Sequence, residues 1–256
     1  MGETTGINYC DSPGRPGATW NPWTGCLPVS AGCAHCYMVR EQRRFGKDPS
    51  VVVRASDATF YAPLKKWKEP RTILAPSWSD FWIEEADEWR DEAWRVIRQT
   101  PWHRYLIVTK RPERIDACLP DDWGQPSFGH VWLGVSIEDA DAWGRWAALA
   151  RSRALAGRRW ISFEPLIGEI QEPLLRKADA WPDWVVIGCE SGSAARPMWY
   201  YWVTDLIAAV CTSRPGTFIW LKQIRTGQYR LGRLVTDADE ITAALRQRCP
   251  RERPWP

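Results

Sequence analysis

The sequence lacks any long apolar segment. No stretch of the 256 residues approaches the roughly 18 consecutive apolar residues that are needed to cross a bilayer. The first five residues, MGETT, also lack the basic and then apolar pattern of a secretion signal. We therefore expect a cytoplasmic protein that has no membrane partner.

The sequence also has little net charge, no internal repeat and no low-complexity tract. Its 34 basic and 31 acidic residues leave a net charge of +3, which is too small to predict binding to a nucleic-acid backbone over the whole surface. The content of 45% apolar and 25% charged residues is typical of a globular protein. We predict a single domain over residues 1–248 and a flexible tail over 249–256, which contains three prolines.

The hydrophobic pattern predicts an α/β fold. From about residue 70, short β-branched runs alternate with stretches that have helical periodicity, as in repeated βα units with a parallel sheet. With an additional first strand near Ile7–Tyr9, we expect about seven units that form a full or partial (β/α) barrel. The other predicted strands are Thr72–Ala75, Tyr105–Thr109, Val131–Val135, Trp160–Phe163, Trp184–Ile187 and Phe218–Leu221. The predicted helices are Tyr37–Phe45, Glu84–Gln99, Asp139–Ala150 and Trp199–Val210.

Polar side chains follow the carboxyl ends of the predicted strands. Active sites of parallel α/β folds are built at that edge, so these residues predict one polar mouth. They are Ser77, Ser79, Asp80, Lys110, Ser136, Glu138, Glu164, Glu190 and Lys222.

Three of the eight cysteines are clustered. Cys26, Cys33 and Cys36 lie within a Gly/Pro-rich loop, residues 19–37, and two residues separate the last two. Without a secretion signal, clustered cysteines predict metal binding rather than disulfides. Three thiolates suit a four-iron cluster that keeps one iron open, whereas a structural zinc site needs a fourth protein ligand, for which His35 and Cys10 are candidates.

The cysteine loop, the aromatic Tyr37 beside Cys36 and the barrel that follows resemble a radical S-adenosylmethionine enzyme. The six residues between Cys26 and Cys33 are a longer spacing than that superfamily usually has. More specifically, the chain resembles a phage-associated family named after phage gene products thirty-seven and sixty-eight, a radical-SAM-like group with a three-cysteine motif. The stretches that carry this resemblance are Thr19–Cys26, Cys33–Tyr37, Ser79–Asp80, Leu106–Arg114, Val131–Glu138, Ile161–Ile170 and Val185–Pro197.

The resemblance implies a [4Fe-4S] cluster on Cys26, Cys33 and Cys36, and S-adenosylmethionine that is cleaved to a 5′-deoxyadenosyl radical. The residues expected to contact the adenosyl cofactor are Ser77, Ser79, Asp80, Ser136 and Glu164. The residues expected to act in catalysis are Glu164, Lys110, Glu190 and Lys222.

The resemblance also implies partners. An electron donor such as flavodoxin or ferredoxin is expected, as is a three-Cys-motif partner protein, and a phage-encoded chain would work in the host cytoplasm. The 19 tryptophans can stack on bases, although we expect most of them to fill the core. With the phage association, they favour a nucleotide or nucleic-acid substrate, with another small substrate as the alternative.

Two other interpretations remain open. A zinc-held loop could form a module that binds nucleic acid or protein without catalysis, or the barrel could be an inactive partner subunit. In addition, Cys189 stands where the phage family usually has a second glycine, after Gly188. Its thiol could pack in the core or act in redox chemistry, and packing is the preferred interpretation.

Overall fold

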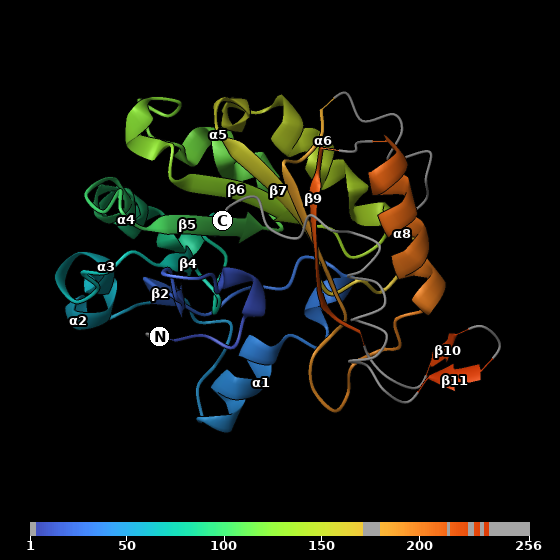
Figure 1. Cartoon of the computed structure of the whole chain (residues 1–256). Helices are drawn as coiled ribbons and strands as arrows, with labels where there is room; N and C mark the ends of the chain where they lie inside the picture. Colours follow the sequence, from blue (N-terminus) through green and yellow to red (C-terminus); the bar gives the residue numbers. More distant parts are fainter. Residues whose placement is uncertain (1–3, 171–179, 214–215, 225–227, 231–232, 236–256) are drawn as a thin grey trace.

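The computed structural model describes residues 4–170, 180–213, 216–224, 228–230 and 233–235, and it shows a curled, all-parallel sheet (Figure 1). Seven strands pair in the order β1-β4-β5-β6-β7-β8-β9, and every pairing is parallel. Within the described residues, β1 and β9 are the two edges, so the sheet forms a half-barrel. The predicted α/β fold is therefore confirmed in its partial-barrel form.

The six strands predicted after residue 70 are all present. Because parallel strands are buried on both faces, they appear in the sequence as nearly continuous apolar runs, which explains why they could be recognised. The strands of the sheet are β1 (Gly17–Thr19), β4 (Thr72–Leu74), β5 (Arg104–Thr109), β6 (Val131–Ser136), β7 (Arg158–Phe163), β8 (Trp184–Gly188) and β9 (Phe218–Gln223). Two small antiparallel pairs lie outside it, β2 (Trp23–Thr24) with β3 (Val53–Arg54), and β10 (Gln228–Arg230) with β11 (Arg233–Val235).

The outer face of the sheet packs against the helices. Alternate strand residues such as Ile107, Val135 and Val185 share one buried cluster with Ile97 of α4 and Leu206 of α8. The α-helices are α1 (Tyr37–Arg44), α2 (Asp57–Phe60), α3 (Ala62–Lys65), α4 (Asp87–Arg98), α5 (Ile115–Cys118), α6 (Gly144–Arg151) and α8 (Tyr200–Ser213). The 3₁₀ helices are η1 (Asn8–Cys10), η2 (Ala31–Cys33), η3 (Glu84–Ala86), η4 (Pro112–Arg114), η5 (Pro126–Phe128), η6 (Ala140–Trp143) and η7 (Arg153–Ala156). The four predicted helices correspond to α1, η3 with α4, η6 with α6, and α8.

The inner face of the half-barrel carries a layer of aromatic side chains near the amino ends of the strands. The rings of Trp160 and Trp184 stack with their centroids 5.1 Å apart, and Tyr9 meets Trp184 edge-on at 5.6 Å. Trp132 and Trp220 belong to the same buried cluster, which also contains Cys10, Leu74, Leu106 and Val186. The expectation that most tryptophans fill the core is confirmed, since those with buried side chains are Trp20, Trp23, Trp67, Trp82, Trp94, Trp123, Trp132, Trp146, Trp160, Trp184 and Trp220.

The predicted first strand, Ile7–Tyr9, is wrong. These residues lead into the 3₁₀ helix η1, where Asn8 Oδ1 accepts a hydrogen bond from Trp220 Nε1 at 2.8 Å. Tyr9 and Cys10 are buried against the inner aromatic layer, so η1 closes the inside of the half-barrel instead of joining the sheet. The first strand is β1, which begins at Gly17. The predicted flexible tail, 249–256, lies outside the described residues.

In the part of the chain that the structure describes, no helix has the length and apolar character required to span a membrane.

Candidate functional site

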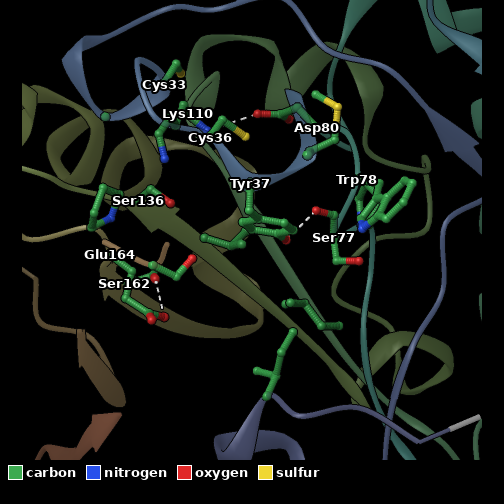
Figure 2. Close-up of a pocket in the computed structure, with 18 of the residues that line it drawn as sticks. Cys33, Cys36, Tyr37, Ser77, Trp78, Asp80, Lys110, Ser136, Ser162 and Glu164 are labelled. Atoms are coloured by element: carbon green, nitrogen blue, oxygen red, sulfur yellow. Dashed lines mark hydrogen bonds between the residues drawn. The ribbon is translucent and has the colours of Figure 1, made fainter. Parts of the chain in front are cut away.

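A cavity of about 530 Å³ opens at the carboxyl edge of the half-barrel (Figure 2). Its position follows from the fold, because parallel strands deliver the residues after their carboxyl ends to one edge. All the predicted site residues line this cavity: Cys26, Cys33, Cys36, Ser77, Ser79, Asp80, Lys110, Ser136, Glu164, Glu190 and Lys222.

The cysteine loop lines part of the cavity. Cys26 follows β2, Cys33 ends η2 and Cys36 directly precedes α1. The loop is pinned at Cys26, whose backbone N–H donates to Pro49 O at 2.8 Å. Gly25 adopts a positive φ of 97°, and a Cβ there would lie 3.0 Å from Val52 Cα, so both the conformation and the space require glycine.

Glu138 anchors the middle of the cysteine loop. Its side chain is 1% exposed, accepts a hydrogen bond from Ser30 of the loop, and pairs with Lys110 at 3.6 Å and with Arg145. Burial alone raises the pKa of this carboxyl, but the charge of Lys110 and the hydrogen bonds from Ser30 and Arg145 outweigh it, so the pKa is lower than usual. Gly32 lies directly against Glu138, because a Cβ on Gly32 would be 2.7 Å from Glu138 Cδ.

Glu190, which follows β8, anchors the same loop. It accepts hydrogen bonds from the backbone N–H of Arg196 at 2.7 Å and from its guanidinium, and His35 Nδ1 lies 3.1 Å from its Oε2. Arg196 in turn donates to Ala31 O in the loop at 2.8 Å. Burial opposes ionisation of Glu190, but the hydrogen bonds from Arg196 and His35 prevail and lower its pKa to about 2. Glu190 is therefore a carboxylate that holds the loop.

Asp80 links the ends of β4 and β5 to Cys26. Its carboxylate accepts hydrogen bonds from Thr109 Oγ1 at 2.7 and 2.9 Å and from the backbone N–H groups of Trp82 and Lys110. It also accepts one from Arg111 Nη1 at 3.3 Å, and the same Nη1 lies 3.7 Å from Cys26 Sγ. Asp80 lines the cavity, and its oxygens accept hydrogen bonds from these partners, so it holds Arg111 beside Cys26. Its predicted contact with the cofactor stays a prediction.

Glu164 and Lys222 form an ion pair in the lining of the cavity. Their Oε1 and Nζ atoms are 2.7 Å apart, and Ser162 Oγ donates to Glu164 Oε2 at 3.2 Å. A Cβ on Gly188 would lie 2.7 Å from Glu164 Oε1, so any side chain there would require the Glu164 carboxylate to shift. Cys189, the next residue, lines the cavity and is 7% exposed, and it also belongs to the buried cluster between the sheet and the helices. Its packing role stays the preferred interpretation.

The three loop thiols all line the cavity. Burial, followed by the charge of Asp80, raises the pKa of Cys26 to about 11, so metal binding there would have to displace a proton. The described residues contain no group of three or more His, Cys, Asp or Glu side chains already arranged around a metal position. The number and type of the thiols suit a three-thiolate cluster, although the structure does not arrange them around one metal position.

A sequence model of the protein family DUF5131, whose description is a protein of unknown function, matches residues 4–244. The chain belongs to the DUF5131 family. The matched region contains the whole cysteine loop and all seven strands of the half-barrel. No curated protein and no solved structure matches the chain significantly. Because the DUF5131 description states no activity, the resemblance to the phage family and to radical-SAM enzymes stays a prediction.

Sequence reasoning missed several residues that build this DUF5131 cavity. Asn21 is 3% exposed, and its Oδ1 accepts hydrogen bonds from the backbone N–H groups of Ser77 and Trp78 at 2.7 and 2.8 Å. Tyr37 crosses the middle of the cavity and donates to Ser77 O (Figure 2). Glu138 follows a predicted strand, and this position could have identified it as a site residue, but it was not chosen as one. The sequence around Asn21 does not indicate its role, because its hydrogen-bond partners lie 56 and 57 residues away.

Proposed function

We propose that this DUF5131 protein is a radical S-adenosylmethionine enzyme that holds a [4Fe-4S] cluster on Cys26, Cys33 and Cys36. The observation that supports it most is the composition of one cavity. Three thiols of a single loop line it together with the polar residues at the carboxyl ends of the strands. A cluster with one open iron needs three protein sulfurs, and a cavity beside it is needed for the ligand of that iron.

The position of Cys10 argues against it as a fourth zinc ligand. Cys10 is fully buried in the inner aromatic cluster and is not among the residues that line the cavity. His35 does line the cavity, and its Nδ1 contacts Glu190, which leaves Nε2 for a metal. The zinc site with His35 as the fourth ligand is therefore the alternative to the cluster, and metal analysis distinguishes the two.

The other cavity residues would bind and orient the adenosyl cofactor. When bound, the cluster and S-adenosylmethionine together would supply a 5′-deoxyadenosyl radical. The ion pair of Glu164 and Lys222 offers one charge of each sign for a zwitterionic ligand, and Ser136 adds a hydroxyl at the same edge. Lys110 and Glu190 stand nearer the cysteine loop, where they hold it through Glu138 and Arg196.

A nucleotide or nucleic acid is the proposed substrate, because the cavity is large enough for a base beside the cofactor's site and opens at a polar edge. The buried tryptophans give this proposal no support. An electron donor such as flavodoxin or ferredoxin would work with the protein in the cytoplasm, and a three-Cys-motif protein is a further candidate partner.

The test is anaerobic reconstitution of the full chain with ferrous iron and sulfide, followed by reduction in the presence of S-adenosylmethionine. We expect stoichiometric iron and sulfide, and the formation of 5′-deoxyadenosine. Cys26→Ala, Cys33→Ala and Cys36→Ala should each abolish cluster binding. The matched control is Cys211→Ala, which changes an exposed thiol of α8 outside the cavity and should leave the iron content intact.

Three outcomes would contradict the proposal. Full iron content after loss of any one of the three cysteines would exclude them as the ligands. A colourless protein with stoichiometric zinc would favour the binding module instead. A bound cluster that never cleaves S-adenosylmethionine under reduction would favour an inactive partner subunit.

A further inference from the structure

The side chain of Arg111 lies between a loop thiol and a buried carboxylate. Its Nη1 is 3.7 Å from Cys26 Sγ and 3.3 Å from Asp80 Oδ2, and its Nη2 donates to Leu27 O at 2.6 Å. Arg111 lines the cavity, yet the residue is only 8% exposed. One guanidinium therefore contacts the thiol, the carboxylate and the backbone of the cysteine loop.

The backbone of Arg111 is fixed as firmly as its side chain. Its N–H donates to Thr109 Oγ1 at 2.8 Å, and the same hydroxyl donates to Asp80 Oδ1 at 2.7 Å. Pro112 follows directly and begins η4, and the proline ring fixes the backbone at that point. Because both ends of Arg111 are held, the N–H that faces Cys26 is in place before any ligand binds.

The other polar side chains around the loop thiols differ from Arg111 in what they contact. Cys33 has a neutral neighbour, since Ser30 Oγ lies 3.9 Å from its Sγ. Lys110 lines the same cavity, but its Nζ pairs with Glu138 at 3.6 Å. Arg111 instead directs a charged N–H donor to a sulfur as well as to a carboxylate.

Asp80 keeps its charge beside Cys26 when Arg111 is removed. Besides Arg111, its carboxylate accepts hydrogen bonds from Thr109 Oγ1 and from the backbone N–H groups of Trp82 and Lys110. These three donors would still hold the carboxylate in its position. Replacing Arg111 with a neutral residue therefore makes the surroundings of the Cys26 sulfur more negative by one charge, because a guanidinium is always protonated.

We propose that Arg111 is a positioning residue that raises the reduction potential of the [4Fe-4S] cluster through the sulfur of Cys26. This inference rests on the proposed function. In the step concerned, a flavodoxin- or ferredoxin-type donor is oxidised by one electron and the cluster is reduced by it, while no bond forms or breaks. The reduced cluster carries one more negative charge, so a guanidinium N–H on a ligating sulfur stabilises the reduced state more than the oxidised state.

The test is a redox titration of the reconstituted full chain, with the reduced cluster detected by electron paramagnetic resonance. We expect Arg111→Gln to keep the wild-type content of iron and sulfide. Its equilibrium constant for reduction should be about tenfold smaller, which is about 59 mV toward negative potential for a one-electron couple. Arg111→Lys keeps the charge without the planar fork, so its potential should lie between those of the wild type and Arg111→Gln.

Arg114→Gln is the matched control. Arg114 ends the same 3₁₀ helix, η4, and also pairs with an aspartate, Asp87, at 2.7 Å, but it does not line the cavity. Its replacement removes an arginine–aspartate pair that has no contact with the three loop thiols. The cluster of this variant should keep the wild-type potential.

Each other result decides against the inference. A wild-type potential in Arg111→Gln overturns it and leaves the proposed cluster intact. A folded Arg111→Gln protein that loses iron overturns it too, because Arg111 would then only secure Cys26. If Arg111→Gln does not fold, Arg111→Lys decides, and a wild-type potential in that variant overturns the inference. A wild-type chain that binds no cluster contradicts the proposed function itself.

Discussion

Replacing Gly32 with alanine should loosen the cysteine loop. The added Cβ would lie 2.7 Å from Glu138 Cδ, which is about 0.7 Å closer than the 3.4 Å at which ordinary contact begins. Glu138 cannot swing away freely, because it is 1% exposed and held by Ser30, Lys110 and Arg145. Either the loop or this set of charge-assisted contacts must shift.

We expect Gly32→Ala to lower the free energy of unfolding by about 2 kcal/mol, within the range of about 1–3 kcal/mol for overpacking a rigid site. We also expect less iron per chain after reconstitution, because the shifted loop carries Cys33. Urea denaturation of the apoprotein and iron analysis measure the two effects separately. Gly144→Ala is the control, since a Cβ at Gly144 meets no atom within 4 Å and alanine there suits the helix.

A double-mutant cycle tests the stated cause. If the clash with Glu138 is responsible, Gly32→Ala should cost less in a Glu138→Ala background, where the opposing carboxylate is gone. An equal loss of stability in both backgrounds would refute the reasoning. So would a Gly32→Ala protein with wild-type stability and iron content.

Three further predictions concern other residues. Glu164→Gln should slow 5′-deoxyadenosine formation by about 10- to 150-fold, because a charge-assisted contact is worth about 1.5–3 kcal/mol, and it should leave the iron content unchanged. An unchanged rate would show that Glu164 has no role in the reaction. His103, whose pKa burial lowers from 6.5 to about 4, should make the wild type lose stability as the pH falls through this interval. Between these pH values the unfolded state binds the proton more readily than the folded state, so His103→Gln should not show this loss of stability. If the free energy of unfolding of the variant and of the wild type changed equally with pH, His103 would not be the cause. Asn21→Ala should cost about 1–3 kcal/mol, because two backbone N–H groups lose their acceptor, and an unchanged urea midpoint would exclude that role.

The strands of the half-barrel were predictable because each is buried on both faces. Runs such as Tyr105–Thr109 and Trp184–Ile187 are almost entirely apolar. They are too short to form stable helices, so a buried strand is the better prediction. The edge strand Gly17–Thr19 was missed because it is only three residues long and lies between Pro16 and Pro22. Its strand conformation depends on pairing with β4, more than 50 residues later, which local propensity does not contain.

The residues that line the cavity could be predicted from the sequence, whereas the contacts that hold the cysteine loop in place could not. Clustering of Cys26, Cys33 and Cys36 is visible in the sequence, and polar residues after parallel strands must share one edge. The roles of Glu138 and Asp80 depend on contacts with the loop, which for Ser30 and Glu138 span 108 residues. The error at Ile7–Tyr9 has the same origin, because the inner aromatic layer decides that conformation.

The most direct test of the central claim is Mössbauer spectroscopy of the chain reconstituted with isotopically enriched iron, recorded with and without S-adenosylmethionine. Three thiolates leave one iron of a cubane without a protein sulfur, so the account predicts a four-iron cluster in which one subsite changes when the cofactor is added. A spectrum without a four-iron cluster, or one whose subsites all stay unchanged, would contradict it.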